Sequence, residues 1–247
     1  MRELCSILML TYNRLEMSRQ TLAHLSASAG YPHELLIWDN GSRDGTQQWL
    51  LEFARKTHFE SRGLLRLVIV LHPSNLGLAP ALNRLLPMTH GRYVAKVDND
   101  VLCPRGWLAG CVRALETWQD LGIVGVCFQS GFPLHLTHCR RNAAVCRKPT
   151  SNLNGACVVW RRTLHEQLGR FCEAYHTYSH WDADWCERIR AAGYWQAYLP
   201  PPKGIHLGDN DPIDYVERKA AYRSRNRSIW HERRRRYRSQ PSARVIP

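Results

Sequence analysis

Runs of apolar residues alternate with amphipathic segments through the first hundred positions of the chain. Continuous apolar runs predict buried strands at residues 6–10, 35–38, 67–71 and 93–97. Between these runs, apolar positions three or four residues apart predict helices at residues 14–28, 47–56 and 78–86. Strands that are apolar on both faces and separated by helices are typical of a parallel sheet covered on both sides. We therefore expect a doubly wound α/β architecture.

The pattern is looser after residue 100. We expect helices at 105–118 and 181–192, and strands at 123–126, 156–160 and just before Pro200. Residues 129–153 show no clear periodicity and are predicted to form a long loop. From about residue 214 the chain is a basic segment that we expect to be helical. The predicted organisation is one domain over residues 1–213, made of halves 1–100 and 101–213, and a C-terminal tail at 214–247.

The positive charge is concentrated in that tail. The chain carries 34 Lys and Arg against 21 Asp and Glu, a net charge of +13. Residues 218–247 hold eleven Lys and Arg and only one acidic residue, Glu232, so the rest of the chain is close to neutral. A basic segment of this kind can bind an anionic membrane surface through residues 218–238, bind nucleic acid, or remain a solvated tail. We favour the membrane surface and regard nucleic acid as the weaker prediction.

Hydrophobicity, the N-terminal residues and cysteine usage together predict a cytoplasmic location. No run of eighteen apolar residues exists that could span a membrane, and the first residues do not resemble a signal peptide. The nine cysteines are scattered, and several lie in apolar runs, which is typical of reduced, buried thiols. His135, His138, Cys139 and Cys146 have the residue types of a zinc site, but their spacing fits no usual zinc template. We expect a cytoplasmic protein, with peripheral contact at the inner face of the membrane as the further expectation.

Polar side chains follow each of the first four predicted strands. They are Thr11-Tyr12-Asn13-Arg14, Asp39-Asn40-Gly41-Ser42, Asn75-Leu76-Gly77 and Asp98-Asn99-Asp100. The carboxyl ends of parallel strands meet at one edge of a sheet, where α/β proteins bind their ligands. Two carboxylates one residue apart at such an edge suit Mg²⁺ or Mn²⁺ bound to a diphosphate. A simple Asp-Asn turn is the alternative for Asp98-Asn99-Asp100.

The order of these motifs resembles glycosyltransferase family 2, whose enzymes have the glycosyltransferase-A fold. The resemblance continues through Asn154-Gly155-Ala156-Cys157, Trp181-Asp182-Ala183-Asp184 and His206-Leu207-Gly208, and it covers residues 5 to about 208. It implies a single Rossmann-like domain with a mostly parallel central sheet covered by helices. Residues 1–100 would be the nucleotide-binding half, and residues 101–213 the acceptor-binding half.

The resemblance also implies roles for individual residues. Asp39 would contact the nucleotide base, Asp98 would hold the ribose or assist the metal, and Asp100 would be the direct metal ligand together with His206. The other expected donor-binding residues are Thr11, Tyr12, Asn13, Arg14, Asn75, Gly77 and Asn99. Gly155, Ala156 and Trp181 are expected near the acceptor and the transferred sugar.

The catalytic base requires a separate argument. Direct displacement at an anomeric carbon needs a carboxylate that takes the proton of the acceptor hydroxyl. The family places this carboxylate in a Glu-Asp pair at the start of a helix, and here Trp181 replaces the first member while Asp182 keeps the second. We assign Asp182 as general base, with Asp184 as the runner-up. Either side chain could instead cap the helix N-terminus.

The predicted function is therefore an inverting glycosyltransferase. It would move a sugar from a nucleotide-diphosphate donor, most commonly a uridine diphosphate sugar in this family, to a hydroxyl acceptor such as a lipid-linked glycan. Mn²⁺ or Mg²⁺ would be the cofactor. The alternative is a catalytically inactive transferase-like domain that binds nucleic acid or a membrane surface through its basic tail. Nucleotidyl transfer is disfavoured, because Thr11-Tyr12-Asn13-Arg14 is not a glycine-rich phosphate loop.

Overall fold

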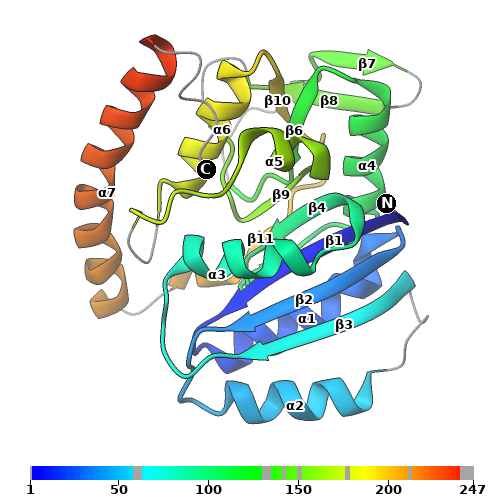
Figure 1. Ribbon diagram of the computed structural model, residues 1–247. Coiled ribbons are helices and arrows are strands. Elements are labelled where there is room, and N and C mark those ends of the chain that lie inside the picture. Colours follow the sequence, from blue (N-terminus) through cyan, green and yellow to red (C-terminus); the bar gives the residue numbers. More distant parts are fainter. Residues whose placement is uncertain are drawn as a thin grey trace.

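The fold is built around one nine-stranded sheet (Figure 1). The computed structural model describes residues 2–57, 63–129, 135–140, 143–148, 152–175, 179–210 and 213–239. The sheet order is β3-β2-β1-β4-β9-β6-β10-β8-β7. Its strands are β1 (Arg2–Thr11), β2 (His33–Asp39), β3 (Leu64–Leu71), β4 (Gly91–Val97), β6 (Leu121–Gly125), β7 (His138–Arg140), β8 (Ala143–Arg147), β9 (Cys157–Arg161) and β10 (Trp195–Tyr198). Strands from both predicted halves of the domain therefore join a single sheet.

Parallel pairing dominates the first half, as the continuous apolar runs predict. β1 pairs in parallel with both β2 and β4, and β2 pairs in parallel with β3. β9 then runs antiparallel to β4 and β6, while β10 is parallel to β6. The α/β fold class is confirmed. The direction of β9 could not be read from its sequence, since an apolar strand buried on both faces has the same pattern in either direction.

Helices cover both faces of the sheet, and alternate residues along β1 supply the two cores. Ile7 and Met9 belong to one core, beneath α1 (Leu15–Ala29), α2 (Thr46–Lys56) and α4 (Trp107–Thr117). Leu8 belongs to the other core, beneath α3 (Leu78–Leu85), α5 (Arg162–Leu168) and α6 (Trp181–Ala191). This arrangement keeps the strand ends open at one edge.

Two predictions for the second half were incomplete. The segment 129–153, predicted to be a loop, contains β7 and β8, which pair with each other and extend the sheet beyond β10. Helix α5 was missed because its seven residues follow β9 directly, with no Gly or Pro between the two elements. The remaining elements are η2 (Leu86–Met88), β5 (Val101–Leu102), β11 (Ile205–His206) and η3 (Leu207–Asn210).

The C-terminal basic segment forms the long helix α7 (Ile213–Ser239), which packs beside α6 (Figure 1). Its inward side is anchored by ion pairs from Arg233 to Asp184 and from Arg234 to Glu187. The described part of α7 is therefore docked on the domain and is not a solvated tail. Among the described residues, no helix is long and apolar enough to cross a bilayer.

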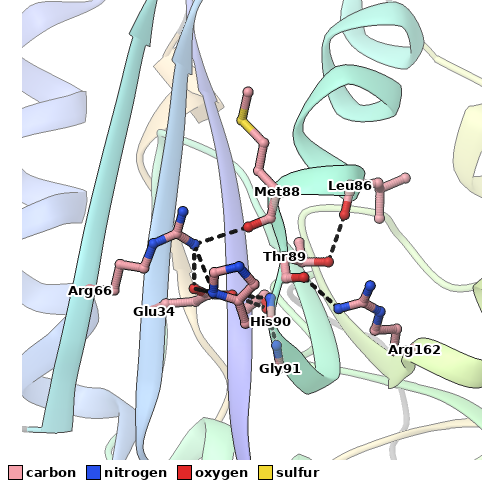
Figure 2. A network of polar contacts seen from close by, with 9 residues as sticks. Glu34, Arg66, Leu86, Met88, Thr89, His90, Gly91 and Arg162 are labelled. Carbon is pink, nitrogen blue, oxygen red and sulfur yellow. Dashed lines mark hydrogen bonds and ion pairs between the residues drawn. The ribbon is translucent and has the colours of Figure 1, made fainter. Parts of the chain in front are cut away.

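A buried carboxylate ties the first four strands together near their amino-terminal ends (Figure 2). Glu34 is 1% exposed and accepts hydrogen bonds from Ser6 Oγ at 2.5 Å, the His90 backbone N–H at 2.6 Å and Arg66 at 2.7 Å. Burial alone would raise the pKa of Glu34, but these hydrogen bonds outweigh it and lower that pKa. The network fixes the sheet at the end away from the polar strand termini.

Candidate active site

The polar residues after β1 and β2 meet, as the parallel pairing requires. Thr11 and Asp39 are register partners at the strand ends, and Thr11 Oγ1 donates a hydrogen bond of 2.8 Å to Asp39. Beyond the strands, Asn13 N–H donates to Ser42 Oγ at 2.7 Å, and Arg43 N–H donates to Asn13 at 2.9 Å. The two turns therefore form one surface, and the side chain of Tyr12 stands out from it, 47% exposed.

Asp39 is saturated with hydrogen bonds from its own chain. Besides Thr11, it accepts from the N–H groups of Gly41 and Ser42 at 3.1 and 2.9 Å, from Ser42 Oγ at 2.5 Å and from Gln47 at 2.7 Å. Its carboxylate is fully buried. A nucleotide base that binds Asp39 would have to replace one of these donors, so the base contact implied by the family resemblance stays a prediction.

The loop after β3 is joined to the same surface by a buried amide. Asn40 donates to the carbonyl of Gly77 at 3.3 Å and accepts from the Leu76 N–H at 3.2 Å. Asn75 closes the turn by accepting from the Gly77 N–H at 2.8 Å. Four strand ends thus lie at one edge, as predicted. Asn75 itself holds the loop in shape.

Asp100 lies in a cluster of basic groups. Arg14 donates to Asp100 Oδ2 at 2.6 Å, and His206 Nε2 lies 3.8 Å from Asp100 Oδ1. Asn13 and Arg14 have positive φ angles of 55° and 64°, and this turn directs the guanidinium group toward Asp100. Gly208 completes the enclosure, because a Cβ atom there would lie 2.8 Å from Asp100 Oδ2. Asn99 points elsewhere and donates to Ser18 Oγ on α1 at 2.8 Å.

A buried lysine links Asp98 to the opposite wall of the site. Lys96 is 1% exposed, forms an ion pair with Asp98 and donates to the carbonyl of Gly155 at 2.9 Å. Its ammonium group also lies 5.0 Å from the centre of the Trp181 ring. Burial raises the pKa of Asp98, while the charge of Lys96 opposes that rise. Lys96 is therefore a buried, paired lysine, and it lines the same cavity as Asp98.

One cavity of about 410 Å³ is lined by Asp98, Lys96, Gly155, Ala156, Trp181 and Asp182. The sequence places the members of this set up to 86 residues apart, and the fold brings them to a single hollow. Gly155 is required by close packing, since a Cβ atom there would lie 2.4 Å from the Trp181 ring and 2.8 Å from the Asp182 Cβ. Of the predicted donor-side residues, only Asp98 is on this lining, where it meets the predicted acceptor-side residues Gly155, Ala156 and Trp181.

Asp182 stands in the first turn of α6 with its carboxylate at the cavity. Its Oδ2 accepts a hydrogen bond of 3.0 Å from the Gly155 N–H, and its Oδ1 accepts one of 2.9 Å from the Ala183 N–H. These bonds leave lone pairs of the carboxylate for a substrate hydroxyl. The Asp182 carboxylate is therefore held at the cavity by two backbone N–H groups.

Asp184 does not fit the role of runner-up base. It is 1% exposed, and its carboxylate accepts hydrogen bonds from Tyr175 at 3.0 Å, Arg233 at 2.8 Å and Tyr237 at 2.8 Å. It is absent from the lining of the cavity. Because its side chain points at α7 and its oxygens are engaged, Asp184 holds two helices together.

The donor set at Asp100 suits a divalent cation that arrives with a diphosphate. Among the described residues, no three His, Cys, Asp or Glu side chains gather closely enough to hold a metal ion. Mg²⁺ and Mn²⁺ need only one or two protein ligands when phosphate oxygens and waters complete the shell. Asp100 and His206, with Asp98 nearby, supply oxygen and imidazole donors of the right type.

The segment from His135 to Cys146 has the residue types of a zinc site. Its described residues pack along the edge of the sheet. His138 stacks on Trp195 with ring centres 5.2 Å apart, and Cys146 is buried while Cys139 is exposed. These contacts stabilise the β7–β8 edge of the sheet.

Several residues of the cavity were not identified from the sequence. Tyr198, Lys148, His180 and Arg223 all line it. The Tyr198 hydroxyl accepts a hydrogen bond of 2.7 Å from the Asn154 N–H, which shapes the wall next to Gly155. Lys96, which was likewise not identified as a site residue, does have a signal in the sequence: it is a lysine in an apolar strand, two residues before an aspartate on the same face.

Comparison with known sequences supports the resemblance. A sequence profile described as "Glycosyl transferase family 2" matches residues 6–170. An N-acetylglucosaminyl-diphospho-decaprenol L-rhamnosyltransferase of Mycobacterium tuberculosis is 22% identical over 246 residues, which covers 83% of this chain and 76% of that protein. The glycosyltransferase AglE of Haloferax volcanii is 26% identical, over 81% of this chain and 66% of that protein.

Solved structures share the fold at low identity. A mannosyltransferase of Pyrobaculum calidifontis, in complex with GDP-Man and Mn²⁺, superposes with a TM-score of 0.66 at 20% identity, covering 88% of this chain and 60% of that one. S. aureus TarS 1-349 in complex with UDP gives 0.62 at 16% identity, covering 82% and 59%. This chain thus spans about three fifths of each solved chain. With a profile match over most of its length and this fold, the chain belongs to glycosyl transferase family 2.

Proposed function

We propose that this protein is an inverting glycosyltransferase that uses a nucleotide-diphosphate sugar and transfers the sugar to a hydroxyl group of an acceptor glycan. One observation carries the proposal: Asp98, from the strand-end edge, and Asp182, at the start of α6, line the same cavity. A donor held at one and an acceptor held at the other would meet there. The inactive-domain alternative is not favoured, because Asp98, Asp100, Asp182 and His206 are all retained.

In this proposal Asp182 is the general base. Its carboxylate takes the proton of the acceptor hydroxyl, and the oxygen attacks the anomeric carbon on the face opposite the diphosphate. The bond between the anomeric carbon and the diphosphate oxygen breaks, the bonding electrons leave with the nucleoside diphosphate, and the configuration inverts. The Gly155 N–H keeps the carboxylate aimed at the cavity.

The donor would lie along the four strand ends. Thr11 to Arg14, Asp39, Asn75 and Gly77 form the proposed nucleotide surface, and Asp98 forms the proposed ribose end, while the side chain of Asn99 is turned toward α1. Asp100 and His206, with help from Asp98, would hold Mn²⁺ or Mg²⁺; when bound, the cation neutralises charge on the leaving diphosphate. UDP is the nucleotide we propose, and solved relatives are in complex with GDP-Man and with UDP.

The acceptor would occupy the wall formed by Gly155, Ala156 and Trp181. The mycobacterial relative is named for a diphospho-decaprenol substrate, which motivates a lipid-linked glycan as the proposed acceptor class. The outward arginines of α7, among them Arg225, Arg227, Arg235 and Arg236, are exposed, so we propose peripheral binding to anionic lipids on the cytoplasmic face. Such binding would weaken steeply with salt, and cosedimentation with anionic vesicles at two salt concentrations tests it.

A thermal-shift screen of nucleotides and nucleotide sugars, with and without Mn²⁺, tests the donor site. Ligands that bind the native state raise the apparent melting temperature. We expect a uridine nucleotide to raise it, and we expect Mn²⁺ to enlarge the effect in the wild type but not in Asp100→Ala. A control on α2 that does not line the cavity, Glu52→Gln, should behave like the wild type. No response to any nucleotide would contradict the proposal.

A further inference from the structure

The turn that precedes α6 forms part of the cavity wall and has an unusual backbone. Ser179 and His180 line the cavity, as does Asp182 in the first turn of the helix. Ser179 and His180 have positive φ angles of 73° and 65°, in the left-handed region that residues other than glycine rarely adopt. Such a conformation persists only where the surrounding contacts impose it. The contacts of this turn therefore bear on the start of the helix that carries Asp182.

The turn and the helix are directly connected. The His180 carbonyl accepts a hydrogen bond of 2.9 Å from the Asp184 N–H, which makes His180 the N-cap residue of α6. Ser179 Oγ lies 2.8 Å from His180 Nδ1, so the two side chains of the turn are linked. A rotation of the His180 peptide would tilt the first turn of α6. The Asp182 carboxylate would then move away from the Gly155 N–H, which it meets at 3.0 Å.

Helix α7 supplies the contacts that hold this turn. Asn226 is fully buried, and its Nδ2 donates a hydrogen bond of 3.3 Å to the Ser179 carbonyl. One turn further along α7, the centre of the Trp230 ring lies 5.9 Å from that of the His180 ring. Positions four residues apart share one face of a helix, so Asn226 and Trp230 lie on the side of α7 that packs beside α6 (Figure 1).

We propose that Asn226 and Trp230 are positioning residues for Asp182, which they keep aimed at the cavity through the Ser179–His180 turn. This inference rests on the proposed transfer function, since it concerns the same base. Asn226 and Trp230 are not among the described residues that line the cavity, so they would act only through the turn. A reacting group displaced by about 1 Å can lose about 10²-fold in rate. Helix α7 would therefore support catalysis without touching the substrate.

The test is hydrogen exchange of the Gly155 amide, followed by NMR, because this N–H is bound by Asp182 and no substrate is needed. Its rate is divided by that of Leu8 in β1, which reports opening of the whole sheet. We expect the ratio to rise about tenfold in Asn226→Ala, as for the loss of one hydrogen bond, and to rise also in Trp230→Leu. Trp230 is only partly buried, so its variant should fold even if Asn226→Ala does not.

Turnover in the transfer reaction is the second measurement. We expect kcat to fall about 10- to 100-fold in Asn226→Ala, with an unchanged dissociation constant for the donor, because only the base is displaced. A role of Asn226 in folding alone would lower the unfolding midpoint without this selective loss of kcat.

Two variants of α7 serve as controls. Tyr237→Phe removes one hydroxyl donor from Asp184 on the packed side of α7. Asp184 keeps its hydrogen bonds from Tyr175 and Arg233, so α6 should stay in place. Ser228→Ala changes an exposed position. Both controls should keep the exchange ratio and the turnover of the wild type, although Tyr237→Phe should lower the unfolding midpoint.

The contrary results are equally specific. An exchange ratio or a turnover equal to that of the wild type in the folded Asn226 or Trp230 variants overturns the inference. An equal change in Tyr237→Phe also overturns it, because general loosening of α7 would then explain the effect. Nucleotide binding with Mn²⁺ and turnover of Asp182→Asn, measured alongside, test the proposed function separately.

Discussion

Replacement of Asp184 by Asn tests the different roles of the two aspartates of α6, Asp182 and Asp184. The Asp184 carboxylate is 1% exposed and is bound by Tyr175, Tyr237 and Arg233. It also lies 3.9 Å from the guanidinium group of the fully buried Arg188. The neutral amide leaves the buried Arg188 and the half-buried Arg233 without their counter-charge and turns an N–H₂ group toward donors.

Loss of one partner from a buried ion pair costs about 3–5 kcal/mol. With a urea m value of about 2–3 kcal/mol/M, the unfolding midpoint of Asp184→Asn should fall by about 1 to 2.5 M while the m value stays unchanged. Urea unfolding followed by circular dichroism measures this. The matched control, Asp182→Asn, removes a partly exposed carboxylate two residues away and should shift the midpoint by far less. An Asp184→Asn midpoint equal to that of the wild type would refute the assignment of Asp184 as the residue that binds α7.

Three further outcomes follow from the geometry. Gly155→Ala places a Cβ atom 2.4 Å from the Trp181 ring, so it should destabilise the fold by about 1–3 kcal/mol and reduce transfer. A fully active and equally stable variant would contradict the close packing of Gly155 against Trp181. Hydrogen bonds lower the pKa of Glu34 on folding. The ionised Glu34 carboxylate therefore stabilises the fold above about pH 4.3, the usual pKa of an unfolded glutamate. This stabilisation is lost as the pH falls through the lower pKa of the folded state. The difference in unfolding free energy between the wild type and Glu34→Gln should therefore shrink on acidification, and a difference that is constant from pH 3 to pH 7 would be the contrary result. Lys96→Met leaves the half-buried Asp98 without its cation, so it should weaken nucleotide-sugar binding in calorimetry. Unchanged affinity would remove Lys96 from the donor site.

The first half of the fold was predictable because its signals are local. Apolar runs that end in polar residues define the strands and place Thr11, Asp39 and Asp98 at one edge without any knowledge of long-range contacts. The position of Asp182 at the start of α6 followed in the same way from helix periodicity.

The features that were not predicted depend on contacts between residues far apart in the sequence. The role of Asp184 depends on Arg233 and Tyr237, which lie 49 and 53 residues further along the chain on α7. The sequence of α7 is so highly charged that its pattern does not reveal which face packs against the domain. Lys96 is buried because Asp98 and Gly155 satisfy it, and Gly155 lies 59 residues further along the chain. The β7–β8 pair has too few residues for a clear alternation and is held by β10.

The most direct test of the central claim is the rate of transfer by Asp182→Asn under saturating donor, acceptor and Mn²⁺, with the donor dissociation constant measured on the same protein. Removal of a general base lowers turnover by about 10²- to 10⁴-fold. The account predicts a loss of this size with unchanged donor affinity and a native unfolding midpoint. Turnover at the wild-type rate would contradict the assignment of Asp182 as the base and, with it, the proposed chemistry of the cavity.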